Sequence, residues 1–270
     1  VESIIFNGSY TKFLDRYCYL NRYYQPYKYH NVKEFQSIMN EYSYRVEKKD
    51  CLDLPDKLPD ILYRIPLAEP TLYKTLLKES CLPDYQIICE NALSTKLRLR
   101  QFLSGNINGK KIKCNKISTL KEFLDDFDKK VVIFAQFTDS IHDIEELLKK
   151  MKLKHITMNG EQKDKLAWKK FNMDETIKVI VIQYQSGNAG VNLQAADTII
   201  YYEPTDRSIF LEQSRDRIHR KGQKNQCTFI HFVTEKTIEM DMYRTVSNYQ
   251  DFTDKLFNQI VLKYQKGRFK

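Results

Sequence analysis

Two arginines and a glutamine stand at regular spacing in residues 212–223, whose sequence is EQSRDRIHRKGQ. Gln213, Arg217 and Arg220 are four and three residues apart, so their side chains would share one face of an α-helix. A guanidinium group is permanently charged, and its planar fork matches the oxygens of a phosphate. The spacing therefore predicts a phosphate-binding helix face. For this helix taken alone, a solvated basic face is the alternative.

The opposite side of the same helix carries Leu211, Ser214 and Ile218, a stripe suited to packing on a sheet. A glycine-containing loop, QSGNAGVNLQAAD, precedes the helix at residues 185–197, between two apolar runs that are typical of buried strands. Such a loop brings backbone N–H groups close to a nucleotide or a DNA phosphate. An ordinary turn between strands explains the loop alone equally well.

Taken together, the loop and the helix resemble motifs V and VI of superfamily-two helicases, in the SWI/SNF-like branch of ATPases. Motif V reads G-G-x-G-[LV]-N-L-x-x-A-[DS] and motif VI reads Q-x-x-x-R-x-x-R-x-G-Q. The matching residues are Gly187, Gly190, Asn192, Leu193, Ala196 and Asp197 in the first, and Gln213, Arg217, Arg220, Gly222 and Gln223 in the second. Asn188 replaces a glycine, Tyr184 replaces the threonine that usually opens motif V, and the tripeptide 206–208 replaces W-N-P.

The resemblance implies roles for the residues of both motifs. Arg217 and Arg220 would be arginine fingers that act on ATP, and Gln213 would orient them or the attacking water. Gly190 and Asn192 would lie near the ribose at the seam between two lobes. ATP with Mg would be held mainly by a first RecA-like lobe of the same parent chain.

Strands and helices alternate regularly after residue 118, which predicts right-handed crossovers and a mainly parallel sheet flanked by helices. The expected strands are 131–137, 154–159, 178–183, 198–203 and 227–233, and the expected helices are 118–127, 140–151, 161–171, 208–221 and 235–259. We interpret residues 116–270 as a RecA-like helicase C-terminal lobe. Residues 1–115, with one further strand at 61–67, are interpreted as a mostly helical protrusion between the lobes.

Loops at the carboxyl ends of parallel strands form the usual ligand-binding edge of such a sheet. We therefore expect the arginines at this edge, together with contacts to the sugar-phosphate backbone of DNA. The candidate DNA-binding residues are Gln136, Thr138, Asn159, Gly160, Lys163, Gln185 and Ser186. The general polarity of loops is the alternative explanation for these residues.

Basic side chains also occur in residues 92–105, which carry the run KLRLRQ, and at Lys116 nearby. These side chains could face DNA, although a solvated helix surface is the preferred interpretation. The segment 105–111, GNINGKK, is not a P-loop, because it has too few residues between its glycines and no Ser or Thr after the lysines. Glu203, alone at the end of an apolar run, lacks the second carboxylate of a Walker B strand.

The chain of 270 residues has a formal net charge of +9 and a pI near 9.0, which favours a polyanionic partner. Its six cysteines show no metal-binding spacing, and neither a signal peptide nor a membrane-length apolar run is evident. We expect a cytoplasmic or nuclear protein, and the frequent Lys, Ile and Tyr suggest a viral or bacterial source. The chain opens at Val1, so we expect it to be part of a longer protein.

These observations predict the C-terminal half of an ATP-dependent double-stranded-DNA translocase. The fragment is expected to be inactive as an ATPase on its own, because it lacks the Walker A and Walker B motifs. A stand-alone nucleic-acid-binding module without ATPase activity is the alternative. A dinucleotide enzyme would need G-x-G-x-x-G after the first strand, and the chain does not contain that pattern there.

Overall fold

The computed structural model describes residues 9–44, 53–160, 166–186 and 190–265. The chain divides into two compact units, Val1–Asp53 and Leu54–Lys270. This boundary separates regions that pack internally, so the predicted functional division at residue 115 stays a prediction. Each unit is described by itself.

Residues 9–44, the described part of the first unit apart from Asp53, contain two helices and a hairpin. Helix α2 (Tyr10–Tyr17) is followed by strands β1 (Cys18–Leu20) and β2 (Pro26–Tyr29), which pair antiparallel, and by helix α3 (Val32–Tyr42). The side chain of Ser9 caps α2 by accepting from the amide of Lys12. The rings of Tyr17 and Phe35 lie 5.3 Å apart and join the two helices.

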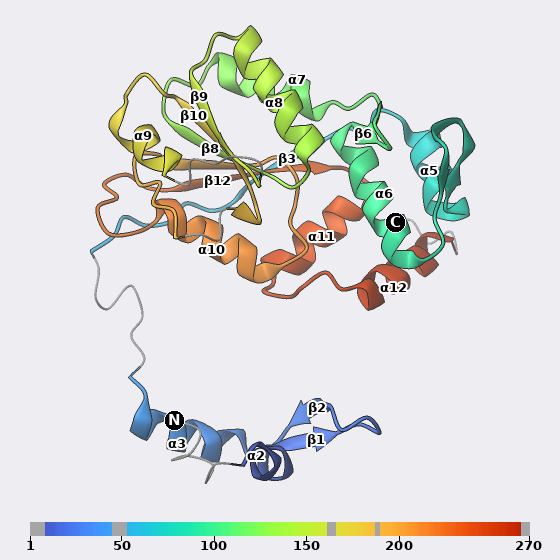
Figure 1. Ribbon diagram of the computed structural model, residues 1–270, viewed down its shortest axis with the longest axis vertical. Coiled ribbons are helices and arrows are strands. Elements are labelled where there is room, and N and C mark those ends of the chain that lie inside the picture. The colour runs from blue at the N-terminus through green and yellow to red at the C-terminus, as the bar shows by residue number, and fades with distance from the viewer. Residues whose placement is uncertain (1–8, 45–52, 161–165, 187–189, 266–270) are drawn as a thin grey trace. The chain divides into compact units, whose positions relative to one another are not determined.

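The second unit is built on a six-stranded parallel sheet with the order β3-β12-β11-β8-β10-β9 (Figure 1). The strands are β3 (Ile61–Ile65), β8 (Val131–Ala135), β9 (His155–Met158), β10 (Val179–Gln183), β11 (Thr198–Tyr201) and β12 (Thr228–Thr234). All six lie within the ranges expected from the sequence, apart from one residue at the end of β12. The predicted parallel α/β architecture is therefore confirmed.

Helices cover both faces of the sheet because strand side chains alternate between the faces. Val132 and Phe134 of β8 point into a core cluster that includes residues of α9 (Ala167–Met173) and α10 (Ser208–Ile218). Val131 and Ile133 point into a second cluster, which contains residues of α7 (Lys116–Asp125) and α8 (Thr138–Lys150). This three-layer arrangement is that of a RecA-like lobe.

A third core cluster joins helices α5 (Pro70–Glu79), α6 (Ala92–Ser104), α11 (Ile238–Ser247) and α12 (Asp254–Gln265). The short pairs β4 (Cys81–Leu82) with β5 (Ile87–Ile88), and β6 (Asn106–Ile107) with β7 (Lys110–Lys111), flank these helices, and the 3-10 turn η1 (Pro83–Tyr85) lies between β4 and β5. The expected long terminal helix is wrong, since α11 ends before α12 begins. Between them the amide of Phe252 donates to the carbonyl of Asp206, at 2.8 Å.

The expectation of a solvated basic surface is wrong for Lys96, Arg100 and Lys116, which are buried, whereas Arg98 is only partly buried. Lys116 forms an ion pair with Glu239 at 2.5 Å. Lys96 and Arg100 lie near Asp206, at 3.7 and 3.4 Å. These cations form ion pairs within the unit and do not form a solvated face.

No helix among the described residues combines the length and the apolar character that a membrane span requires.

Candidate nucleotide and nucleic-acid interface

Helix α10 places the candidate phosphate-binding residues. It follows β11 and buries Leu211, Ser214 and Ile218 against the sheet, as the sequence stripe predicted. The hydroxyl groups of Ser214 and Tyr201 lie 2.8 Å apart, which fixes the helix on its own preceding strand. Gln213 and Arg217 lie on α10 and are half-buried.

The helix ends at Ile218, so Arg220 lies in the following turn. His219 leaves the helical conformation, and its Nε2 atom lies 2.8 Å from the carbonyl oxygen of Pro55. Gly222 completes the turn with φ of +99°, and a Cβ atom there would lie 3.2 Å from the side-chain oxygen of Gln194. The prediction of one continuous helical face is correct for Gln213 and Arg217 and wrong for Arg220.

Arg217 and Arg220 are neighbouring cations, and the charge of nearby Asp216 offsets their repulsion only in part. Burial, and after it the nearby charge of Arg220, lower the pKa of the Arg217 guanidinium. The Nε atom of Arg217 is buried and has no hydrogen-bond partner among the described residues. The Nε atom of Arg215 is unpaired in the same way, so the feature that distinguishes Arg217 is its repulsion by Arg220.

Arg215 shows the contrast within the same helix. Its guanidinium forms ion pairs with Asp60 and, at 3.1 Å, with Glu212, and it lies over the ring of Phe229. Its charge is therefore used inside the unit, where it joins α10 to the segment before β3. The motif spacing singled out Arg217 and not Arg215, but only the fold shows the acidic partners of Arg215.

The arginine pair lies at the amino-terminal edge of the sheet. The carbonyl oxygen of Arg217 accepts from the amide of Leu193, at 2.9 Å, and Gln223 Nε2 donates to the carbonyl of Ala196, at 2.8 Å. Both partners come shortly before β11 begins. The expected position at the carboxyl edge is wrong, because a helix that connects parallel strands must run back across the sheet.

The two predicted nucleotide contacts, Gly190 and Asn192, precede Leu193, whose amide donates to the Arg217 carbonyl at the end of α10. Gly190 is exposed and has φ of +64°. The Asn172 side chain holds Asn192 in place, because its Nδ2 atom donates to the Asn192 carbonyl at 2.8 Å. The structure thus brings Asn192 close to the backbone of Arg217 through the neighbouring Leu193. Gly187, of the same motif, lies outside the described residues.

The predicted DNA contacts gather at the opposite, carboxyl edge. Gln183, at the end of β10, connects two of them: its Nε2 atom donates to the carbonyl of Gln136, at 3.3 Å, and its Oε1 atom accepts from the amide of Gly160, at 3.4 Å. The remaining positions follow the same strand ends: Thr138 opens α8, Asn159 follows β9, and Gln185 and Ser186 follow β10. Lys163 lies outside the described residues.

Glu203 belongs to this edge, although the sequence interpretation dismissed it. Its buried carboxylate accepts from the amide of Gln136, at 2.6 Å, and from the hydroxyl of Ser140. Burial raises the pKa of the Glu203 carboxyl, while nearby Lys116 and the Gln136 amide oppose the shift. Glu203 thus holds the loop after β8. The sequence signal that could have indicated this role is the position of Glu203 at the end of an apolar run.

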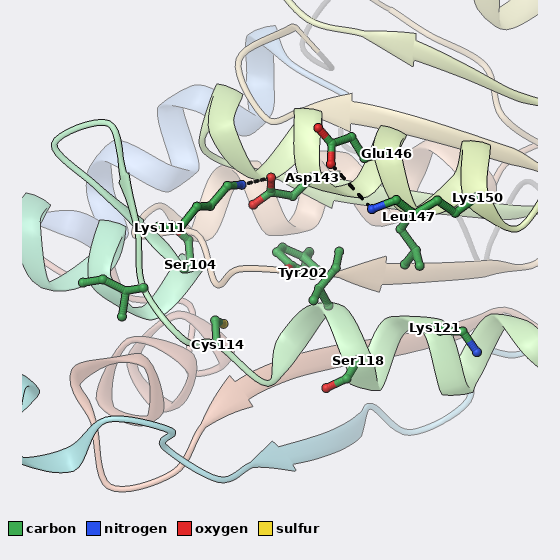
Figure 2. A pocket seen from close by; sticks show the side chains of 13 residues that line it. Ser104, Lys111, Cys114, Ser118, Lys121, Asp143, Glu146, Leu147, Lys150 and Tyr202 are labelled. Atoms are coloured by element: carbon green, nitrogen blue, oxygen red, sulfur yellow. Dashed lines mark hydrogen bonds and ion pairs between the residues drawn. The ribbon is translucent and has the colours of Figure 1, made fainter.

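A separate cavity of about 350 Å³ lies beside α7 and α8, and none of the candidate site residues lines it (Figure 2). Figure 2 shows its charged rim, where Lys111 pairs with Asp143, and Lys150 lies 3.9 Å from Glu146. Burial raises the pKa of the Cys114 thiol in its wall, so that thiol is a poor nucleophile. Its lysines face carboxylates, so we assign no phosphate site there.

No group of three or more potential metal ligands occurs in the described part of the chain.

The helicase conserved C-terminal domain matches residues 115–222, a range that contains the glycine loop and α10. Helicase SWR1 of Debaryomyces hansenii is 28% identical to the chain over 216 residues, 79% of this chain. Residues 115–222 thus match a helicase C-terminal domain, and the chain is similar to SWI/SNF-like superfamily-two ATPases. The corresponding helicase of Schizosaccharomyces pombe is 30% identical over 152 residues, which are 54% of this chain.

The chain spans only 13% and 12% of the length of these two relatives. Both are fungal proteins, so they give no support to the expected viral or bacterial source.

Two solved structures share the fold of this SWI/SNF-like lobe. The C-terminal part of the Fun30 ATPase domain has a TM-score of 0.59 at 16% identity, covering 79% of this chain and 99% of that one. The Sulfolobus solfataricus SWI2/SNF2 ATPase core, solved in complex with double-stranded DNA, has a TM-score of 0.60 at 20% identity. That likeness covers 97% of this chain and 60% of the archaeal chain.

Proposed function

We propose that this chain is the C-terminal half of an ATP-dependent double-stranded-DNA translocase. In this proposal the amino-terminal edge of the sheet completes an ATP site, and the carboxyl-terminal edge holds the DNA backbone. A first RecA-like lobe supplies the remaining contacts to ATP and Mg. Action on DNA agrees with the expected cytoplasmic or nuclear location.

The observation that carries the proposal is the pair of neighbouring arginines. Two guanidiniums that repel each other, with the repulsion only partly offset by Asp216, are costly unless an anion joins them. Arg215, on the same helix, forms ion pairs with Asp60 and Glu212. The fold therefore neutralises an arginine whose role is structural. The γ-phosphate of ATP matches the charge and the planar donors of Arg217 and Arg220.

The arginines would act by electrostatic stabilisation. Hydrolysis of ATP supplies the free energy for movement, and the role of this lobe is to place positive charge against the phosphate as it leaves. Arginine fingers of this kind contribute roughly 10³–10⁵ in rate. Gln213, one helical turn before Arg217 and without a described hydrogen bond, is placed to orient the arginines or the attacking water.

Backbone contact at the carboxyl edge suits a translocase. The polar groups of Gln136, Asn159 and Ser186 follow adjacent strands and offer amides and hydroxyls to phosphate oxygens. The formal charge of +9 adds sequence-independent affinity for DNA that falls with salt. The fold of an archaeal ATPase core that was solved with double-stranded DNA supports the assignment of this partner.

One loop reaches both edges, which supports a coupling between ATP and DNA. It leaves the carboxyl end of β10 at Tyr184, and Leu193 contacts Arg217 just before β11. Tyr184 donates its hydroxyl to the carbonyl of Glu203, at 2.9 Å, so the start of the loop is anchored to the DNA edge. A shift of either end would therefore be felt at the other.

The test is DNA-stimulated ATP hydrolysis by this chain together with its first lobe. Arg217→Ala and Arg220→Ala should each lower kcat by about 10³ or more, while ATP binding stays mostly intact. Arg207→Ala is the matched control, because Arg207 is an exposed arginine at the start of α10 with only a 3.5 Å ion pair to Asp251. Near-normal turnover in either test variant would overturn the finger assignment.

A second arm addresses the chain alone. With DNA and ATP present, the isolated chain should release no phosphate above background. Brisk turnover would contradict the assignment of the ATP-binding walls to another lobe. DNA binding without ATPase activity even when the first lobe is supplied would instead favour a stand-alone nucleic-acid-binding module.

A further inference from the structure

The first unit carries an exposed aromatic surface that the proposed function does not use. Strands β1 and β2 and the turn between them, residues 18–30, form what we call the tyrosine hairpin (Figure 1). Five tyrosines project from it with 47–82% of their surface exposed: Tyr19, Tyr23, Tyr24, Tyr27 and Tyr29. Large exposed aromatic patches mark binding surfaces, because leaving them in water is unfavourable.

Hydrogen bonds within the turn, to both the side chain and the backbone of Asn21, stabilise the tip of the tyrosine hairpin. The side-chain oxygen of Asn21 accepts from the amides of Tyr23 and Gln25, at 2.8 and 3.0 Å. The amide of Asn21 donates to the carbonyl of Gln25, at 2.9 Å, which closes the loop. Tyr23 and Tyr24 are thus presented from an ordered turn, and less conformational entropy is lost when they bind a partner.

The charge on the tyrosine hairpin is entirely positive. It contains Arg22, Lys28 and His30 and no Asp or Glu. The Arg22 guanidinium lies 4.8 Å from the ring centroid of Tyr23, and Lys28 Nζ lies 5.8 Å from that of Tyr19. Neither cation forms an ion pair with a described carboxylate, whereas Arg16 in α2 is paired with Glu34.

Flat aromatic faces that alternate with unpaired cations match the chemistry of a nucleic acid with unpaired bases. We infer that the tyrosine hairpin binds single-stranded nucleic acid, with tyrosines stacking on bases and Arg22 and Lys28 contacting phosphates. A duplex fits less well, because its bases are already stacked on one another and present only edges. This inference goes beyond the proposed function and does not depend on it.

The experiment measures fluorescence anisotropy of labelled oligonucleotides with the full chain. The probes are single-stranded oligothymidylate and oligouridylate of roughly 20 nucleotides, an abasic strand of the same charge, and a duplex. The test variant is Tyr23→Ala with Tyr27→Ala, which leaves the left-handed residue Tyr24 in place. Tyr23→Phe with Tyr27→Phe keeps the rings, and Tyr10→Ala removes an equally exposed tyrosine outside the hairpin.

The double alanine variant should bind the single strand on the order of 30-fold more weakly, since each lost stack costs about fivefold or more. The phenylalanine variant and Tyr10→Ala should bind as the wild type does, and all forms should bind the abasic strand weakly. The ratio of oligothymidylate to oligouridylate affinity tells DNA from RNA.

Equal affinity of the wild type for the abasic strand, or unchanged binding by the alanine variant, would overturn the inference. So would tyrosine-dependent binding of the recombinant first lobe with no binding of oligonucleotides, which would make the hairpin a contact between lobes. Near-normal ATP turnover in the variants at the arginine pair, with tyrosine-dependent single-strand binding intact, would overturn the proposed function alone. Circular dichroism of each variant checks that the first unit is folded.

Discussion

At the scale of single residues, the two glutamines of the helix motif have opposite surroundings. Gln223 is buried, and its amide donates to the carbonyls of Ala196 and Ile218 and accepts from the amides of Lys224 and Asn225. Gln213 is half-exposed and has no described hydrogen bond. The same motif therefore contains one residue that holds the fold and one that is available to a ligand.

Gln223→Ala should lower the free energy of unfolding by about 1–3 kcal/mol, because it leaves buried carbonyls without their donor. Gln213→Ala should change stability by no more than about 0.5 kcal/mol and should instead lower DNA-stimulated ATPase activity when the first lobe is present. Urea unfolding and phosphate release measure the two effects. The assignment fails if Gln213→Ala is the more destabilising change.

Glu203 predicts a pH dependence of stability. Its pKa is raised by burial, so the folded protein binds a proton that the unfolded chain releases at lower pH. The free energy of unfolding should therefore fall as pH rises from the ordinary carboxyl pKa through the raised one, and then level off. Glu203→Gln, which can still accept from the Gln136 amide, should remove this slope. An unchanged slope in urea titrations at several pH values would show that another group is responsible.

At the scale of elements, a buried ion pair joins helices that the sequence places far apart. Lys116 at the start of α7 and Glu239 at the start of α11 meet inside the unit, and Glu239 also accepts from the amide of Thr234, at 2.9 Å. Burying two charges is tolerated only because each satisfies the other.

Lys116→Met should cost about 3–5 kcal/mol of stability, since it leaves the Glu239 carboxylate buried without its cation. Adding Glu239→Gln should recover part of that loss, because the amide oxygen can still accept from Thr234 while the charge is gone. Thermal or urea unfolding of the single and double variants measures the coupling. Additive effects of the two changes would show that the pair contributes no net interaction.

At the scale of the whole molecule, the division after Asp53 separates two packing units. The sheet and its three core clusters lie entirely after Leu54. A chain that begins at Leu54 should therefore unfold in one cooperative transition, with a free energy of unfolding within about 1 kcal/mol of that of the same unit in the full chain.

The shortened chain should keep duplex binding and lose the single-strand binding attributed to the tyrosine hairpin. Loss of cooperative unfolding on truncation would mean that the first unit supports the lobe. Anisotropy with both probes and urea unfolding give the two readouts.

Local pattern was sufficient for much of this protein. Apolar runs of strand length and amphipathic helices predicted all six strands and a mainly parallel sheet. This was possible because the pattern of buried and exposed side chains within one element appears in consecutive residues. The motif around Arg217 pointed to a helicase C-terminal domain, which residues 115–222 match, since those spacings are local as well.

Contacts between segments that are distant in the chain could not be predicted from these local patterns. Whether an arginine is only partly offset, like Arg217, or neutralised, like Arg215, depends on Asp60, which is remote in the chain and adjacent only after folding. The same holds for Lys116, whose partner comes from α11, and for Arg220, whose turn is set by His219 meeting Pro55. Charge pairing and burial are properties of three-dimensional neighbours, and a spacing rule along one helix carries no information about them.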